Sequence, residues 1–171
     1  MKRIIQFLLL VLLNVYAVNS NAIPTFFDQD SYQKIIHNKK DSNFLMLLWS
    51  LDCQSCIEDL SVVSLFHKNN PGIDIVMIST DQIIRLNEIS SLMSEYGLND
   101  VEQWIFQSNQ FNQLSKSIDP QWRGELPRSY FYTSGERIST LSGRLHKADF
   151  DKWLLDQNSG QSKVSKKAEA Q

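Results

Sequence analysis

Apolar and polar positions follow two different periods along this chain, and together they predict an α/β protein. Two short runs, 44–49 and 73–79, are almost continuously apolar, which is typical of strands buried on both faces. Between them Cys56, Leu60 and Val63 recur at helical spacing, and this predicts a helix over 53–68. A helix of that length permits a right-handed crossover, so the two strands are expected to be parallel.

The same patterns divide the rest of the chain into further elements. In chain order they predict a helix over 28–36, a helix over 83–96, a strand over 103–106, a helix over 108–118, a hairpin of strands over 128–132 and 137–141 that turns at Gly135, and a helix over 147–156. Residues 158–171 have no apolar period and are expected to be a disordered tail. The sequence thus predicts one folded domain over 23–157.

The first 22 residues have the pattern of a secretory signal peptide. Lys2 and Arg3 precede an apolar stretch over 4–18, and small residues, Ser20 and Ala22, stand at the two positions that matter for cleavage. The stretch is shorter than the roughly 20 residues of a membrane-spanning helix, although an uncleaved membrane anchor remains the alternative. Cleavage after position 22 would leave a net charge of about −4, which makes nucleic acid an unsuitable partner.

The only two cysteines in the chain, Cys53 and Cys56, are separated by two residues at the predicted start of a helix. Unpaired backbone N–H groups and the helix dipole favour a thiolate at the first position, so Cys53 is expected to be the exposed nucleophile and Cys56 the buried resolving thiol. A disulfide that closes so short a loop removes little chain entropy and would be a poor structural staple. Two thiolates alone do not complete a metal site, and no cofactor motif is present, so neither a metal nor a cofactor is expected.

Two motifs resemble those of the thioredoxin fold. Trp49-Ser-Leu-Asp-Cys-Gln-Ser-Cys56 is similar to the Trp-x-x-x-Cys-x-x-Cys of that fold, and Gly124-Glu-Leu-Pro127 is similar to the loop that holds its cis-proline. The 71 residues from Cys56 to Pro127 leave room for a strand-helix insertion between the βαβ unit and the C-terminal ββα unit. With the exported N-terminus, residues 26–156 resemble TlpA/ResA-type periplasmic thiol-disulfide oxidoreductases. The resemblance implies a central mixed β-sheet flanked by helices and a periplasmic location, or a membrane-anchored protein that faces the periplasm.

The resemblance also assigns roles to individual residues. Asp59 stands where this branch has a carboxylate that exchanges a proton with the second cysteine, although it could simply be a polar residue on the helix surface. Pro127 is expected to be cis and to turn the Leu126 backbone outward for pairing with a client, unless it is an ordinary proline at the start of a strand. Trp49 and Trp122 are expected to pack near the site and to border the client-binding surface.

The residues around the nucleophile indicate the direction of electron flow. Asp52 is expected to cap the helix through the Ser55 N–H and to oppose the Cys53 thiolate, while Gln54 and Ser55 add no cation. A less favoured thiolate lowers the reduction potential, which favours reduction of client disulfides.

A monomer that takes electrons from a membrane thiol reductase is the expected form of such a protein. A disulfide-donating oxidase or isomerase, and a thioredoxin-fold copper-handling protein, are the alternatives.

Overall fold

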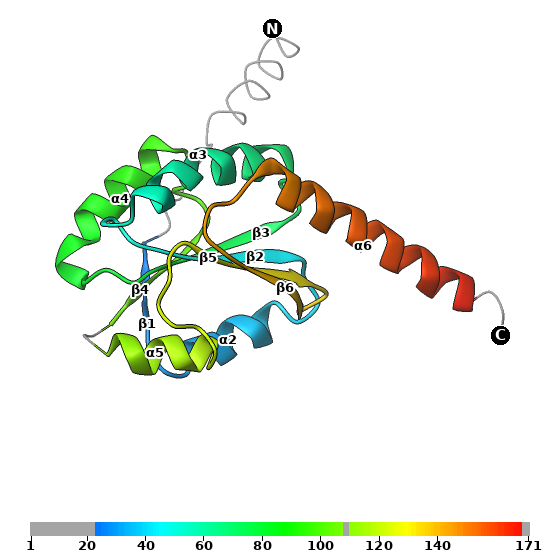
Figure 1. The fold of residues 1–171 in the computed structure, drawn as a ribbon, viewed down its shortest axis with the longest axis horizontal. Helices are drawn as coiled ribbons and strands as arrows, with labels where there is room; N and C mark the ends of the chain where they lie inside the picture. Colours follow the sequence, from blue (N-terminus) through cyan, green and yellow to red (C-terminus); the bar gives the residue numbers. More distant parts are fainter. Residues whose placement is uncertain (1–22, 108–109, 169–171) are drawn as a thin grey trace, which may run out of the picture.

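A computed structural model describes residues 23–107 and 110–168, with side chains as far as 157. Its centre is a six-stranded mixed sheet with the order β1-β4-β3-β2-β5-β6 (Figure 1). Strands β1, β4, β3 and β2 run parallel to one another, and β5 pairs antiparallel with β2 and forms an antiparallel hairpin with β6. The strands are β1 (Thr25–Phe27), β2 (Phe44–Trp49), β3 (Asp74–Ser79), β4 (Glu102–Phe106), β5 (Arg128–Thr133) and β6 (Glu136–Ser142).

Helices cover both faces of this sheet, as Figure 1 shows, with α2 and α5 on one face and α3, α4 and α6 on the other. The described helices are α2 (Ser31–Asn38), α3 (Gln54–Asn69), α4 (Leu86–Glu95), α5 (Phe111–Ile118) and α6 (Lys147–Ala168), and a short 3₁₀ turn, η1 (Ile83–Arg85), precedes α4. The fold is therefore thioredoxin-like, and β4 with α5 supplies the predicted insertion between the βαβ unit and the C-terminal hairpin and helix.

Strand β2 is the centre of the core because its residues are buried on both faces. Leu45, Leu47 and Trp49 pack with α3, α4 and α6, while the alternate residues 44, 46 and 48 pack with α2 and α5. This alternation follows from the two-residue period of a strand, and it explains why β2 reads as a continuous apolar run. The cysteine motif follows directly after the most buried strand of the sheet.

Most predicted elements are confirmed, although the helix predicted over 28–36 is Ser31–Asn38 and the helix predicted over 108–118 is Phe111–Ile118. Three further differences concern other elements. Strand β1 was not predicted, since three residues are too few to show a period, and it pairs with β4 at the sheet edge. The helix predicted from 83 begins instead at Leu86, after η1. The last helix continues beyond the predicted end at 156 to Ala168 and so includes most of the stretch expected to be a disordered tail, where Gln, Ser, Lys and Ala offer adequate helix propensity.

The predicted hairpin turns where expected. Gly135 has φ +75° and its N–H donates to the Ser42 carbonyl oxygen at 3.0 Å. No helix among the described residues is both long and apolar enough to cross a bilayer. The predicted signal peptide over 1–22 lies outside the described residues.

Candidate redox site

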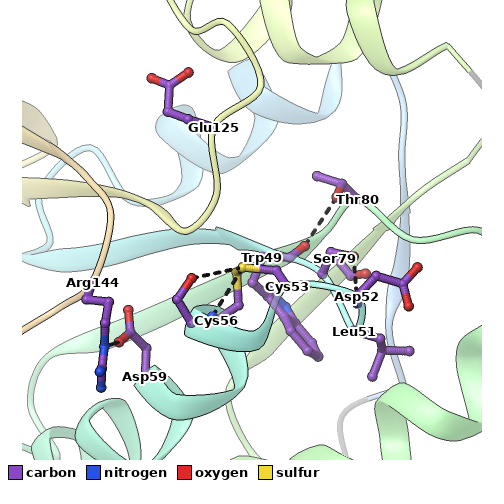
Figure 2. Close-up of a disulfide and its surroundings, with 12 residues drawn as sticks. Trp49, Leu51, Asp52, Cys53, Cys56, Asp59, Ser79, Thr80, Glu125 and Arg144 are labelled. Atoms are coloured by element: carbon purple, nitrogen blue, oxygen red, sulfur yellow. Dashed lines mark hydrogen bonds and ion pairs between the residues drawn. A yellow bond between two sulfur atoms is a disulfide. The ribbon is translucent and has the colours of Figure 1, made fainter.

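The two cysteines form a disulfide at the N-terminus of α3, with an S–S distance of 2.10 Å and a Cα–Cα distance of 5.2 Å (Figure 2). Cys53 is the N-cap residue, with extended backbone angles, and its Sγ accepts a hydrogen bond from the Cys56 N–H at 3.2 Å. A cysteine at this position lies beside the unpaired backbone N–H groups and at the positive end of the helix dipole. Both favour a thiolate when the disulfide is reduced.

The two sulfur-bearing residues differ in exposure. Cys53 is partly exposed, whereas Cys56 is fully buried in the core cluster that also contains Trp49 and Leu60. A client sulfur can therefore approach Cys53 from solvent but not Cys56. This asymmetry supports the predicted division between nucleophile and resolving thiol.

The capping role predicted for Asp52 is wrong. The Asp52 side chain is 81% exposed and forms a 2.7 Å ion pair with Arg85 Nη1, whereas Cys53 caps the helix. Cys53 Sγ takes the place of the expected carboxylate because the helix begins one residue later than predicted, at Gln54. The charge of Asp52 is thus partly compensated by a cation that sequence reasoning did not detect.

The two residues between the cysteines lie near the surface and carry no charge. The Ser55 hydroxyl is 3.4 Å from Cys53 Sγ, and Gln54 is exposed, with its Nε2 donating to Glu58 at 3.3 Å. As predicted, this pair of residues brings no cation to the nucleophile.

Asp59 is fully buried, on the turn of α3 that follows Cys56, and is not a surface residue. Its Oδ2 accepts a hydrogen bond from the Leu145 N–H at 2.9 Å, and its Oδ1 lies 3.6 Å from Arg144 Nε without a hydrogen bond (Figure 2). Burial raises the pKa of this carboxyl, and the Leu145 and Arg144 contacts only partly offset that rise. A buried carboxyl with a raised pKa next to a redox-active pair is suited to proton exchange.

The loop predicted to hold a cis-proline does so. The Leu126–Pro127 peptide bond is cis, Pro127 is buried, and Leu126 is partly buried between the two core clusters. In Figure 2 the loop that carries Glu125 lies across β2 from α3, and the Glu125 side chain points away from the disulfide. The contact between Leu126 and a client stays a prediction.

The two tryptophans are core residues. Trp49 is 1% exposed and packs on the α3 side of the sheet, and Trp122 is 4% exposed and packs on the opposite side, with its Nε1 donating to the Glu125 carbonyl oxygen at 2.8 Å. Their expected packing is confirmed, whereas neither side chain is exposed enough to border a client-binding surface. Their rings are used instead to fill the core on each side of β2.

Sequence reasoning missed two residues beside the motif, Asp81 and Arg85. Asp81 comes just after β3, at the carboxyl end of a parallel strand, where polar side chains often gather at a functional edge, so its position was a usable signal. Nothing in the sequence pattern pointed to Arg85. Among the described residues there is no group of three or more His, Cys, Asp or Glu side chains that could hold a metal ion.

Comparison with protein-family profiles and with characterised sequences gives no significant match. Solved structures do match. A secreted disulfide oxidoreductase of Mycobacterium tuberculosis homologous to E. coli DsbE aligns with a TM-score of 0.55 at 15% identity, covering 70% of this chain and 85% of that one. DsbF of M. tuberculosis aligns with a TM-score of 0.52 at 10% identity (68% and 81% covered), and a DsbF homologue of Corynebacterium diphtheriae with 0.52 at 15% identity (71% and 75% covered).

At these identities the likeness establishes the fold. The chain has a thioredoxin-like fold that it shares with these structures, and it carries a Cys-x-x-Cys disulfide at the start of the helix after the central strand.

Proposed function

We propose that this protein is an exported thiol-disulfide oxidoreductase that reduces disulfides in client proteins through Cys53 and Cys56. The observation that carries the proposal is the asymmetric disulfide at the N-terminus of α3, with one sulfur reachable and the other buried. A pair arranged in this way can exchange disulfides with a client and then release it.

Local charge supports the reducing direction. Cys53 Sγ contacts a backbone N–H and the Ser55 hydroxyl, and neither is cationic. In the adjoining cluster one guanidinium faces three carboxylates, from Asp52, Asp81 and Glu88, so this cluster, which includes the residue before Cys53, is net negative. Negative charge disfavours a thiolate and lowers the potential of the couple.

The reaction follows from the two positions. The Cys53 thiolate attacks one sulfur of the client disulfide, forming a mixed disulfide and releasing the other client sulfur, which takes a proton from water. The Cys56 sulfur, after losing its proton, attacks Cys53 Sγ, forms the intramolecular disulfide and releases the second client sulfur, which is protonated in turn. The client gains two electrons and two protons, and the cysteine pair is oxidised.

Asp59 is the proposed proton acceptor for Cys56. Both residues lie on the same side of α3, one turn apart, and both are fully buried. Water cannot easily take the proton of a buried thiol, so a nearby carboxylate lowers the cost of forming the attacking thiolate. The raised pKa of Asp59 means that it holds the proton better than an exposed carboxylate would.

The N-terminus supports action outside the cytoplasm, in the periplasm, with a membrane thiol reductase as electron donor. The apolar stretch over 4–18 and the small residues at positions 20 and 22 are the basis of this part of the proposal. N-terminal sequencing of protein from its native host should give Ile23 as the first residue. An intact Met1 in the membrane fraction would instead identify the stretch as an anchor.

A redox titration tests the direction of electron flow. The protein is equilibrated in glutathione buffers of graded composition, and the reduced fraction is read after acid quenching and thiol labelling. We expect a potential below about −180 mV, together with catalysis of insulin reduction when dithiothreitol supplies electrons. A potential near the roughly −120 mV of the DsbA-type oxidant would overturn the reductase assignment in favour of disulfide donation.

A further inference from the structure

A buried carboxylate fastens the segment that carries the nucleophile. Asp81 is 7% exposed, and its side chain accepts hydrogen bonds from the Ser50 hydroxyl at 2.9 Å, the Leu51 N–H at 2.9 Å and the Ser79 hydroxyl at 2.7 Å. The Cys53 N–H in turn donates to the Ser50 carbonyl oxygen at 3.2 Å. The path of the chain from the end of β2 to Cys53 therefore depends on Asp81.

Arg85 links the buried Asp81 carboxylate to the exposed carboxylate of Asp52, which precedes Cys53. Its Nη1 lies 2.7 Å from Asp52 Oδ1 and 3.3 Å from Asp81 Oδ1, and its Nη2 lies 3.0 Å from Glu88 Oε2. Hydrogen bonds to Glu88 and Asp52 hold the pKa of the Arg85 guanidinium above its already high usual value, so it is charged at every relevant pH. Figure 2 shows the Asp52 carboxylate pointing away from the disulfide, on the side opposite Asp59.

We propose that Arg85 is a positioning residue for the redox reaction: it holds the Asp52 carboxylate against Asp81 and away from Cys53. This inference rests on the proposed thiol-disulfide function and adds the residue that sets its potential. Without the guanidinium, two like charges would face each other at the start of η1, and Asp52 would be free to turn toward the sulfur. Removal of Arg85 therefore takes away a positive charge and frees a negative charge next to Cys53. Both effects disfavour the Cys53 thiolate.

The test compares four variants with the wild-type protein: Arg85→Gln, Arg85→Lys, Arg85→Gln with Asp52→Asn, and Arg137→Gln. Arg137 is a matched control because it is also a partly exposed, ion-paired arginine, but it lies opposite Tyr132, which pairs with the start of β2 rather than with its cysteine end. Two quantities are measured on each reduced protein. One is the midpoint of the pH profile for alkylation of Cys53 by iodoacetamide, and the other is the equilibrium with glutathione.

Arg85→Gln should move the alkylation midpoint to higher pH and shift the glutathione equilibrium toward the protein disulfide by about tenfold, equivalent to ~30 mV for a two-electron couple. Adding Asp52→Asn in the same chain should restore most of both shifts, because the released carboxylate is then neutral. Arg85→Lys should give intermediate values, because an ammonium keeps the charge but has no second nitrogen to pair with Glu88 while the first contacts Asp52 and Asp81. Arg137→Gln should match the wild-type protein.

Wild-type values in Arg85→Gln, or an equal shift in Arg137→Gln, would overturn the proposal. If Arg85→Gln does not fold, Arg85→Lys decides in its place, and a wild-type midpoint and equilibrium in that variant would overturn the proposal equally. Both measurements report on Cys53 and Cys56 themselves and need no client protein. A protein that showed these shifts but did not reduce insulin would therefore refute the proposed function and not the role of Arg85.

Discussion

The backbone N–H of Leu145, in the loop between β6 and α6, donates to the buried carboxylate of Asp59 at 2.9 Å. This bond joins the helix of the cysteine pair to the C-terminal part of the fold, 86 residues further along the chain. It leaves Oδ1 of the same carboxylate without a hydrogen bond. Asp59 is therefore held in place, but only one of its two carboxylate oxygens accepts a hydrogen bond. Two predictions rest on this arrangement.

Asp59 should make the protein less stable as pH rises. Burial raises its pKa above the ordinary value of 3.8, so the folded state binds this proton more tightly than the unfolded chain does. The associated stability is complete below 3.8 and is lost as pH increases through the raised value. Asp59→Asn keeps an acceptor for Leu145 and carries no charge, so urea midpoints of the variant should lack this decline. The exposed Asp41→Asn is the matched control and should keep the wild-type profile; parallel profiles for Asp59→Asn and wild type would contradict the prediction.

The same substitution should slow release of the client. If Asp59 accepts the proton of Cys56, Asp59→Asn should lower the rate of resolution by about 10²-fold or more at neutral pH, since general base assistance contributes roughly that much. Rapid quenching during reduction of a model disulfide peptide would then show an accumulated mixed disulfide on Cys53. Formation of that mixed disulfide should proceed at the wild-type rate. Slowing of the first step instead would place the carboxylate's effect on Cys53.

The two cysteines should differ in trapping. Cys53→Ser should abolish reduction of insulin and form no mixed disulfide, because Cys56 is buried and cannot reach a client. Cys56→Ser should still attack clients through the partly exposed Cys53 and remain bound to them. Non-reducing gels followed by mass spectrometry would identify the linked client and the sulfur involved. Equal trapping by both variants would contradict the assigned roles.

Most of the fold could be predicted from the sequence because most elements are determined by the residues within them. The short apolar run over 44–49 is typical of a buried strand, and the turn at Gly135 needed a residue that tolerates positive φ. Elements whose cause is not local were missed or misplaced. Strand β1 (Thr25–Phe27) has too few residues for a period and is defined by its pairing with β4.

The site was predictable where chemistry depends on spacing in the sequence, and not where it depends on contacts between distant segments. Cys53 and Cys56 follow from their spacing and from the preceding strand. Arg85 lies 33 positions from Asp52, and only the folded chain brings them into contact. The tryptophans pack in the core as expected, but their predicted contribution to the client-binding surface is wrong for a related reason, since a large aromatic residue near a motif can face either a client or the core, and only tertiary packing decides.

Gly135, at the turn of the hairpin, should not tolerate a side chain. It adopts φ +75°, and a Cβ built on it would clash with the backbone of Lys40. Gly135→Ala should therefore lower the free energy of unfolding by at least about 2 kcal/mol, from the left-handed conformation and from the displacement of a backbone group. Gly72→Ala is the matched control, because a Cβ there would meet nothing within 4 Å, and its effect should be small or stabilising. Urea unfolding measures both, and equal stability of the two variants would contradict the prediction.

A cation placed between the cysteines should convert the protein into a stronger oxidant. Ser55 already lies 3.4 Å from Cys53 Sγ, so a protonated imidazole at that position would stabilise the thiolate, and Gln54 is the first helical residue, where proline is tolerated. Gln54→Pro with Ser55→His should raise the potential toward the roughly −120 mV of DsbA-type proteins in the glutathione titration. Gln54→Pro with Ser55→Asn is the control, because asparagine approximates the shape of histidine without its charge. If both double variants shift equally, the backbone rather than the charge sets the potential, and the electrostatic account of the direction of electron flow would have to be abandoned.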